Sequence, residues 1–490
     1  MPKKKRRTRR TAEVGDVYTA RAPDGRYGAV QVVGCPSKDE AEIVTFGALF
    51  PEAPTIEEAL SMPLLEDDLD GDVQVDRQRV PARVPWWVER VGAAEPVRTF
   101  DSQRRSSRSG AWSLLGAYDR ETQAEHEIDP WRYDAGEIEV DVGGGAASLR
   151  ADSWHVLVGK GRELQPSEAG RVRFRALDAL PRLHSVDYLG DDPAIIDYAV
   201  RRRLVSLAWR GGTTNTIDLS ASQLFELTLE VPDRATVLRV PEGLTTLTLS
   251  GAIENLVVEG ACTDLPFELT IESPQILPPP RGLENALKAA YTGVTDSDTS
   301  GLAAYSRLTE LRIWGGPGVV RDATGLAKLD KLRELALYDL YDVDAAAWPD
   351  DWPHLDGAVI FGLRKSEAAK VKASLATVPD VTVRQVRSDA WIEDNLNNPF
   401  RDWDTDGATL AKKARAAWKK AKRAAAKADS EEDAHAVLAT LVEALNAIAL
   451  RYDLDTVRRE EAHAAFLSLA RDLGIPEDRA GTWFDDLRDF

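Results

Sequence analysis

A motif with apolar residues at its first, fourth and sixth positions recurs through the middle of the chain. Side chains alternate between the two faces of a strand, so each copy predicts one short strand with an apolar face. Successive copies begin 21, 20, 20, 22, 42, 24, 23 and 23 residues apart. In order, the copies are Leu183, Val186, Tyr188; Leu204, Leu207, Trp209; Leu224, Leu227, Leu229; Leu244, Leu247, Leu249; Pro266, Leu269, Ile271; Leu308, Leu311, Ile313; Leu332, Leu335, Leu337; Leu355, Ala358, Ile360; and Val378, Val381, Val383.

This spacing is typical of leucine-rich repeats, and the motif resembles that family. The resemblance implies a solenoid over residues 166–388, in which stacked units bury their apolar faces in one continuous core. We read the 42-residue interval as an insertion or a degenerate repeat with a helix near residues 283–291. Short strands at residues 237–240 and 256–258 are expected on the outer face. The Asn or Cys that the family carries three residues after the third apolar position is replaced by Gly212, Pro232, Ala252, Gly316 and Leu340.

The fifth and seventh positions of each motif are predicted to point away from the core, because strand side chains alternate. In the first half of the repeats these positions are small or acidic. In the second half the seventh position is aromatic, and Arg312 lies beside it at a fifth position. Aromatic residues with Arg are typical anchors of protein interfaces, so we expect a partner-binding stripe here. The alternative is that C-terminal helices cover the stripe, because large exposed apolar patches are uncommon. The stripe consists of Arg312, Trp314, Tyr338 and Phe361.

Residues 13–165 have a β-rich pattern that begins after a basic tail at residues 1–12. An Asp-Gly pair at Asp24-Gly25 between alternating apolar runs predicts a hairpin. The sequences Gly15-Asp16-Val17, Asp24-Gly25-Arg26-Tyr27, residues 46–50 and residues 129–138 resemble the immunity protein 26 family of bacterial polymorphic-toxin systems. The resemblance covers about 150 residues and implies a non-enzymatic domain that binds a toxin, with no catalytic residue.

From residue 389 to residue 490 the apolar spacing becomes helical. The pattern predicts helices that begin near residue 408, that contain residues 437–448, and that contain residues 462–473 before Gly474. Asp406 is expected to cap the first of these helices. The fold class is therefore multidomain α+β: an N-terminal β-rich domain, a central solenoid and a C-terminal helical cap.

The net charge is −19, so most of the surface is acidic and unsuited to nucleic acid or anionic membranes. Two segments differ: residues 1–10 contain seven Lys and Arg, and residues 411–428 contain eight, with no acid in either. Two distant cysteines fit a reducing cytoplasm. We expect neither a signal peptide nor a membrane-spanning helix.

Candidate chemistry is sparse. Asp402, Asp404 and Asp406 match the first half of a calcium-binding EF-hand loop, but Lys413 replaces the Glu that should complete it. Whether this loop binds calcium stays open, as does the role of the basic tail. Two Glu-x-x-His pairs, Glu432 with His435 and Glu460 with His463, lack the further Glu residues of a di-iron bundle. The sequence predicts no catalytic residue, no metal site, no cofactor and no enzyme.

We therefore interpret the chain as a cytoplasmic, non-catalytic binding protein that neutralises or scaffolds a protein partner, with a basic toxin as one candidate. One alternative is an adaptor subunit of a bacterial signalling, motility or phage-defence assembly. A second is a nucleic-acid-associated protein that uses the basic tail and the basic segment at residues 411–428. Sequence leaves open which domain binds, the partner's identity and the oligomeric state.

Overall fold

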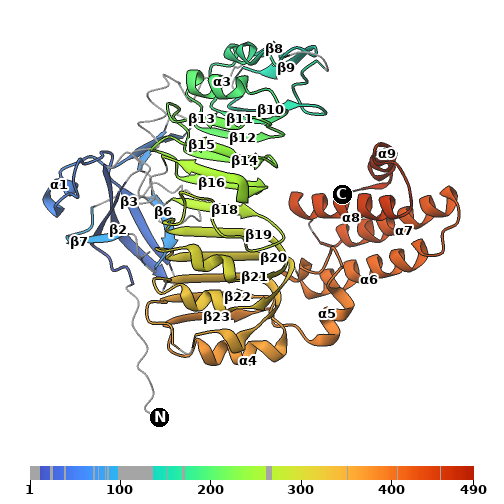
Figure 1. Cartoon of the computed structure of the whole chain (residues 1–490). Helices are drawn as coiled ribbons and strands as arrows, with labels where there is room; N and C mark the ends of the chain where they lie inside the picture. Colours follow the sequence, from blue (N-terminus) through green and yellow to red (C-terminus); the bar gives the residue numbers. More distant parts are fainter. Residues whose placement is uncertain are drawn as a thin grey trace. The chain divides into compact units, whose positions relative to one another are not determined.

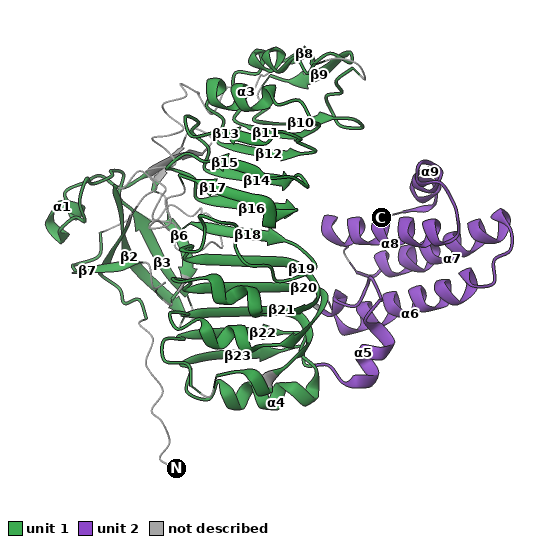
Figure 2. Ribbon diagram, in the orientation of Figure 1, with its two compact units in different colours: residues 1–386 green, residues 387–490 purple. Residues whose placement is uncertain are grey.

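A computed structural model describes residues 11–489 except residues 22–25, 38–39, 70–71, 76, 83, 85–87, 98–135, 152, 168–170, 261–266, 350, 406 and 453 (Figure 1). The chain forms two compact units, residues 1–386 and residues 387–490 (Figure 2). The first unit contains two larger sheets, and the second unit contains helices only in its described part.

The N-terminal part of the first unit is an antiparallel sheet with strand order β6-β3-β2-β1-β7. The expected hairpin is present, since Arg21 pairs with Tyr27, although Asp24 and Gly25 lie outside the described residues. Apolar clusters lie on both faces of this sheet, one around Tyr18 and one around Phe46. The elements are β1 (Asp16–Arg21), β2 (Tyr27–Ser37), β3 (Glu40–Thr45), α1 (Ile56–Leu60), β4 (Glu66–Leu69), β5 (Asp72–Val75), β6 (Arg77–Pro81) and β7 (Glu89–Ala93).

A separate hairpin, β8 (Glu137–Asp141) with β9 (Ala146–Arg150), precedes an eleven-stranded parallel sheet. The strands of this sheet follow one another in chain order, which is the arrangement expected of a repeat solenoid (Figure 1). They are β10 (His155–Gly159), β11 (Ser185–Leu189), β12 (Ser206–Arg210), β14 (Glu226–Val231), β16 (Thr246–Gly251), β18 (Glu268–Glu272), β19 (Lys288–Asp298), β20 (Glu310–Asp322), β21 (Glu334–Val343), β22 (Gly357–Phe361) and β23 (Asp380–Arg384).

The register of this sheet stacks equivalent motif positions on one another. Leu227 pairs with Leu247, and Leu247 pairs with Leu269. Leu227, Leu247 and Leu269 are all essentially inaccessible and belong to one continuous apolar core. The alternation of apolar and polar residues along each strand therefore sets which face is buried. The sheet begins at β10, which lies ahead of residue 166, where we expected the solenoid to start.

The 42-residue interval contains a complete repeat, not an insertion. Its strand is β19, and the predicted helix near residues 283–291 is wrong. Ala286, Ala289 and Tyr291 occupy the three apolar positions and are buried. Ala289 pairs with Leu269 on one side and with Leu311 on the other. Alanine favours helices in isolation, but hydrogen bonding to strands on both sides overrides that weak preference.

Shorter elements connect the strands. The expected outer strands form a parallel three-stranded sheet of β13 (Thr216–Asp218), β15 (Thr236–Arg239) and β17 (Leu256–Glu259). The connections also contain helices α3 (Ala194–Arg202) and α4 (Lys365–Ser374). Short 3-10 helices in these connections lie at residues 174–179, 253–255, 300–304, 324–328 and 345–347, and the second unit has one at residues 403–405.

In the second unit, four of the described helices contribute to one apolar core, which includes the buried rings of Phe400, Trp403, Phe466 and Phe484. The three expected helices are present, and α5 and α9 are additional. Gly407 occupies the N-cap position before the helix that begins at Ala408, and Asp406, the expected cap, lies outside the described residues. The helices are α5 (Asp389–Asn395), α6 (Ala408–Ala425), α7 (Glu431–Ala449), α8 (Thr456–Asp472) and α9 (Glu477–Leu487).

Candidate functional site

The three aromatic residues of the predicted stripe lie on adjacent strands β20, β21 and β22. Trp314 pairs with Tyr338, and Tyr338 pairs with Phe361. The Trp314 and Tyr338 ring centroids are 5.2 Å apart with an interplanar angle of 11°. Those of Tyr338 and Phe361 are 5.6 Å apart at 20°. All three side chains are half-buried. They form a stacked row, called the aromatic row below, whose rings are held in place by one another.

The backbone adopts a left-handed conformation directly after two of the three rings. Asp339 follows Tyr338 in a left-handed conformation, with φ of +52°, and Gly362 follows Phe361 with φ of +85°. After Trp314, a side chain at Gly315 would place its Cβ 2.2 Å from the carbonyl oxygen of Asp339. The backbone after the aromatic row is therefore closely packed at Gly315 and left-handed at Asp339 and Gly362.

Arg312 lies two residues before Trp314, on the same face of β20. Its guanidinium lies 2.5 Å from a carboxylate oxygen of Glu310 and 3.4 Å from one of Glu268. Burial by itself would lower the pKa of Arg312, but these two carboxylates outweigh it and raise the pKa above its ordinary value. The side chain remains 36% exposed. Arg312 is thus a fixed cation beside the aromatic row and already has two partners within the sheet.

Sequence reasoning missed a further row at the third motif position, whose side chains share the outward face with the fifth and seventh positions. Lys288 pairs with Glu310 in this row, at 3.2 Å between ammonium and carboxylate. Strand alternation alone could have located it. In the earlier repeats the third and seventh positions carry carboxylates, most of them exposed. These are Glu226, Glu230, Glu268 and Glu272.

The other sequence candidates have structural roles. The Asp404 carboxylate lies 2.9 Å from the Arg387 guanidinium and 3.0 Å from that of Arg415, so two cations already occupy it. The His435 ring packs edge-on against Trp483, and the His463 ring contacts Phe484. Within the described residues, no group of three or more His, Cys, Asp or Glu side chains is arranged to hold a metal ion.

Much of the immunity-like motif at residues 129–138 lies outside the described residues, which resume at Gly136. Of the earlier motif, Asp16 is buried and accepts hydrogen bonds from the Tyr18 hydroxyl and the Arg90 side chain. This arrangement makes Asp16 part of the sheet's structure. No helix in the described part of the chain is both long enough and apolar enough to cross a membrane.

Neither a protein-family model nor a curated protein matches the sequence. Among solved structures, the chain is similar to the crystal structure of an internalin from Listeria monocytogenes 4b F2365. The identity is 14%, the TM-score is 0.19, and the match covers 49% of this chain and 88% of the internalin chain.

Proposed function

We propose that this protein is a non-catalytic binding protein of the leucine-rich-repeat type, which holds a protein partner on the outward face of its parallel sheet. The observation that carries the proposal is the aromatic row. Three half-exposed rings stacked on adjacent strands offer a large apolar contact area that loses little conformational entropy on binding. The Arg312 guanidinium beside them has a fixed position, so a charged contact with it would orient the partner.

The charge of the same face indicates the chemistry of the partner. Glu226, Glu230, Glu268 and Glu272 precede the aromatic row along the sheet, on a chain of net charge −19. A partner that combines cationic side chains with an apolar patch complements both halves of the face, and opposite charges speed its association. The resemblance of the N-terminal domain to immunity protein 26 makes a basic toxin, neutralised in the cytoplasm, the specific partner that we propose.

The second candidate function is an adaptor in a signalling, motility or defence assembly, in which the same face binds a partner that is not toxic. Toxin or immunity genes beside this gene would favour neutralisation, and assembly components would favour the adaptor. Association with nucleic acid is a weaker candidate, because the carboxylates on the sheet face repel phosphate.

The test is a pull-down from host lysate with the full chain, followed by mass spectrometry. A Trp314→Ala/Tyr338→Ala/Phe361→Ala variant is compared with wild type. The matched control, Thr228→Ala/Thr248→Ala/Thr270→Ala, changes three outward residues of β14, β16 and β18 on the same face. We expect the aromatic variant to lose the partner and the threonine control to retain it. Retention of the same partner by a folded aromatic variant would contradict binding at this row.

A further inference from the structure

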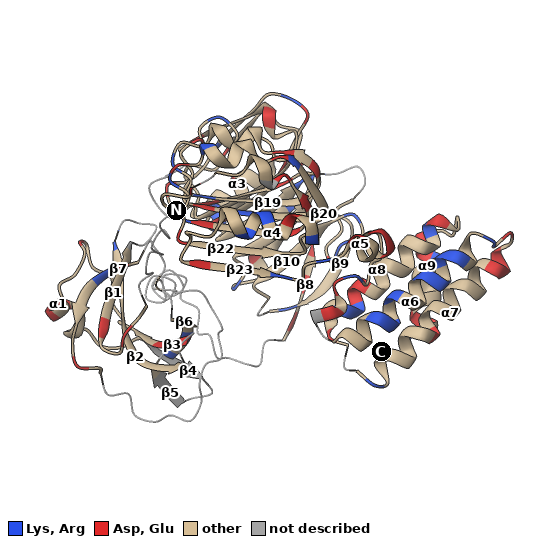
Figure 3. Ribbon diagram, turned by 90° about the horizontal axis from the view of Figure 1, so that it is seen from below, with Lys and Arg blue, Asp and Glu red and all other residues tan. Residues whose placement is uncertain are grey.

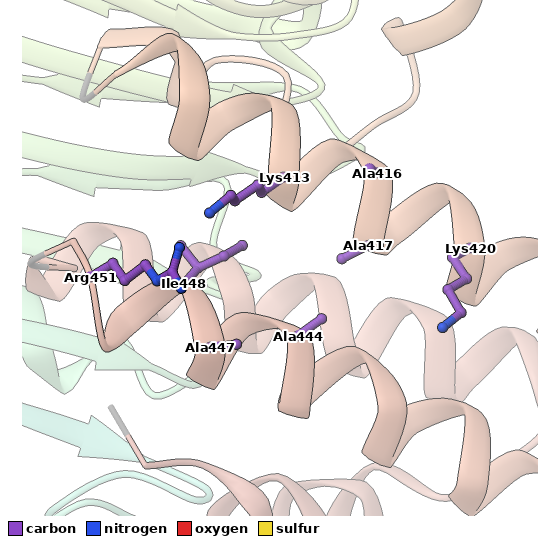
Figure 4. A pocket seen from close by; sticks show the side chains of 8 residues that line it. All are labelled: Lys413, Ala416, Ala417, Lys420, Ala444, Ala447, Ile448 and Arg451. Atoms are coloured by element: carbon purple, nitrogen blue, oxygen red, sulfur yellow. The ribbon is translucent and has the colours of Figure 1, made fainter.

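The second unit carries a groove that the proposed binding face does not involve. It lies between α6 and α7 and is open to solvent (Figure 4). One part, of about 480 Å³, is lined by Lys413, Ala416, Ala417, Lys420, Ala444, Ala447, Ile448 and Arg451. A second part, of about 310 Å³, shares Lys420 with the first and continues past Lys427 and Val437. The two parts form one channel along the helix pair, called the α6–α7 groove below.

Cations border this groove along its length. Lys413 and Lys420, seven residues apart on α6, lie on one side of that helix, and Lys427 lines the second part of the groove from the turn that follows α6. Arg451, just beyond the end of α7, lies at the same end of the groove as Lys413 (Figure 4). One carboxylate, that of Asp433, lines the far end, where it accepts a hydrogen bond from the Ser430 hydroxyl. The lining is therefore strongly cationic around an apolar floor.

Three of the other cations of α6 are ion-paired, whereas Lys412 and Arg423, like the cations that border the groove, have no ion-pair partner among the described residues. Arg415, Lys419 and Lys422 are paired with Asp404, Asp394 and Asp472. Lys413, Lys420, Lys427 and Arg451 have no ion-pair partner in the part of the chain that the structure describes, and Lys413 only approaches the Tyr452 ring at 5.7 Å. Figure 3 shows the Lys and Arg residues along α6. These four groove-lining cations therefore form a positively charged border without ion pairs, on a chain whose net charge is −19.

We propose that the α6–α7 groove binds an acidic amphipathic helix of a protein partner, which packs as a third helix against α6 and α7. Alanines at Ala416, Ala417, Ala444 and Ala447 leave room for a helix to approach closely. The helical stretch from Lys413 to Ala425, where α6 ends, spans about 18 Å at 1.5 Å per residue, which is roughly three helical turns. Carboxylates spaced seven residues apart on the incoming helix would meet the two groove-lining lysines of α6, and its apolar residues would cover the floor.

Nucleic acid fits this groove less well. Duplex recognition relies on contacts to phosphates and base edges, and single strands require aromatic platforms for stacking. The floor is alanine, isoleucine and valine, and neither part of the groove has an aromatic side chain in its lining. An apolar floor between cationic edges matches an amphipathic helix better than a uniformly charged backbone.

The test uses fluorescence anisotropy with the full chain. The probe is a labelled helical peptide of about 20 residues, long enough to span the groove, with Glu every seventh position beside an Ala and Leu face. A second peptide replaces each Glu with Gln. A Lys413→Glu/Lys420→Glu variant is compared with Lys412→Glu/Arg423→Glu, which makes the same charge change at exposed α6 positions outside the groove lining. Ala444→Trp fills the groove without changing its charge.

We expect the acidic peptide to bind wild type and the Lys412/Arg423 control with similar affinity. Binding should weaken about tenfold or more in the Lys413/Lys420 variant and in Ala444→Trp. The Gln peptide should bind wild type more weakly than the Glu peptide. Equal weakening by both charge variants, or no measurable peptide binding, would overturn the proposal. So would binding of a 20-base-pair DNA duplex that depends on Lys413 and Lys420 while the peptide does not bind.

Discussion

The hydroxyl of Tyr291 lies 3.1 Å from the hydroxyl of Tyr305, and both side chains are buried in the core of the parallel-sheet unit. Tyr291 also donates a hydrogen bond to the Leu277 carbonyl oxygen at 2.6 Å. The two phenols are therefore unequal, because Tyr291 satisfies two partners and Tyr305 depends on Tyr291.

This inequality predicts different effects of removing each hydroxyl. Tyr291→Phe leaves both the Tyr305 hydroxyl and the Leu277 carbonyl without this partner, and we expect it to lower the free energy of unfolding by about 1–3 kcal/mol. Tyr305→Phe leaves the bond to Leu277 intact and should have a smaller effect. Denaturant unfolding of the two variants and wild type provides the measurement. Equal losses would contradict the assigned hydrogen bonds.

The same pair predicts a decline in stability at alkaline pH. Burial raises the pKa of Tyr291 and of Tyr305 above the ordinary value. Their stabilisation is present in full below the unfolded pKa of about 10 and is lost as the pH rises through the higher folded pKa values, because only the unfolded chain ionises readily. The free energy of unfolding of wild type should therefore fall above about pH 10 more steeply than that of a Tyr291→Phe/Tyr305→Phe variant. Parallel curves would show that the pair does not contribute.

The left-handed turn at the eighth motif position predicts a graded response to alanine. Gly293 and Gly251 share a φ of +78°. At Gly293 the nearest heavy atom to an added Cβ lies 4.0 Å away, whereas at Gly251 the Val231 carbonyl oxygen would be 2.4 Å away. We expect Gly293→Ala to cost about 1–2 kcal/mol, the strain of the left-handed backbone alone. Gly251→Ala should cost roughly twice as much, because the contact adds to the strain. Thermal unfolding of both variants separates the two effects.

The stacking in the aromatic row predicts that its central ring stabilises the sheet most. Tyr338 contacts two rings and Phe361 contacts one. Leucine keeps much of the apolar surface while it removes the ring, and each ring pair contributes about 0.5–1.5 kcal/mol beyond burial. Tyr338→Leu should therefore lower the free energy of unfolding by about one pair energy more than Phe361→Leu. A chemical-denaturation series measures the difference, and the reverse order would argue against the stack in solution.

Asp16 predicts an acid-sensitive contribution of the N-terminal sheet. Burial by itself raises its pKa, but hydrogen bonds from Tyr18 and Arg90 outweigh burial and lower the pKa below its ordinary value. The stabilisation is thus present above the unfolded pKa of about 3.9 and is lost as the pH falls through the lower folded value. Asp16→Asn should destabilise the protein near neutral pH, and its deficit relative to wild type should shrink in acid. A deficit that is constant with pH would exclude the charge as its cause.

The repeat motif identified the strands of the parallel sheet wherever its apolar positions carry large side chains, as at Leu207 and Leu247. It failed at β19, because Ala286 and Ala289 carry a weak strand signal and only their neighbours in the sheet identify the repeat. It also passed over the eighth motif position, where Gly251, Gly293 and Gly362 adopt left-handed conformations. The glycines recur at this position in the sequence, but a glycine alone does not show whether its backbone is left-handed.

The identity of the aromatic row was predictable, since strand alternation alone puts Trp314, Tyr338 and Phe361 on one face. Their mutual stacking and the pairing of Arg312 with Glu310 were not, because rotamers and ion pairs depend on cross-strand register. The Gly315-Gly316-Pro317-Gly318 segment indicates an irregularity in β20 beyond Trp314, but it does not specify the shifted register. The α6–α7 groove was also beyond sequence reasoning, since a run of lysines and alanines predicts a helix but not the surface between two helices.

Each strand of the parallel sheet is hydrogen-bonded only to its immediate neighbours in the order, and β23 is the last of them. A sheet of this kind can unfold from its ends, one repeat after another. Phe361 is carried by β22, the next-to-last strand, and it pairs there with Arg384 of β23. Unfolding of the last repeat, which contains β23, would therefore leave Phe361 without a neighbouring strand on that side while the central repeats are still folded. Affinity for the partner proposed for this row would therefore depend on the folding of the last repeat, and a partner that contacts Phe361 would slow unfolding from that end.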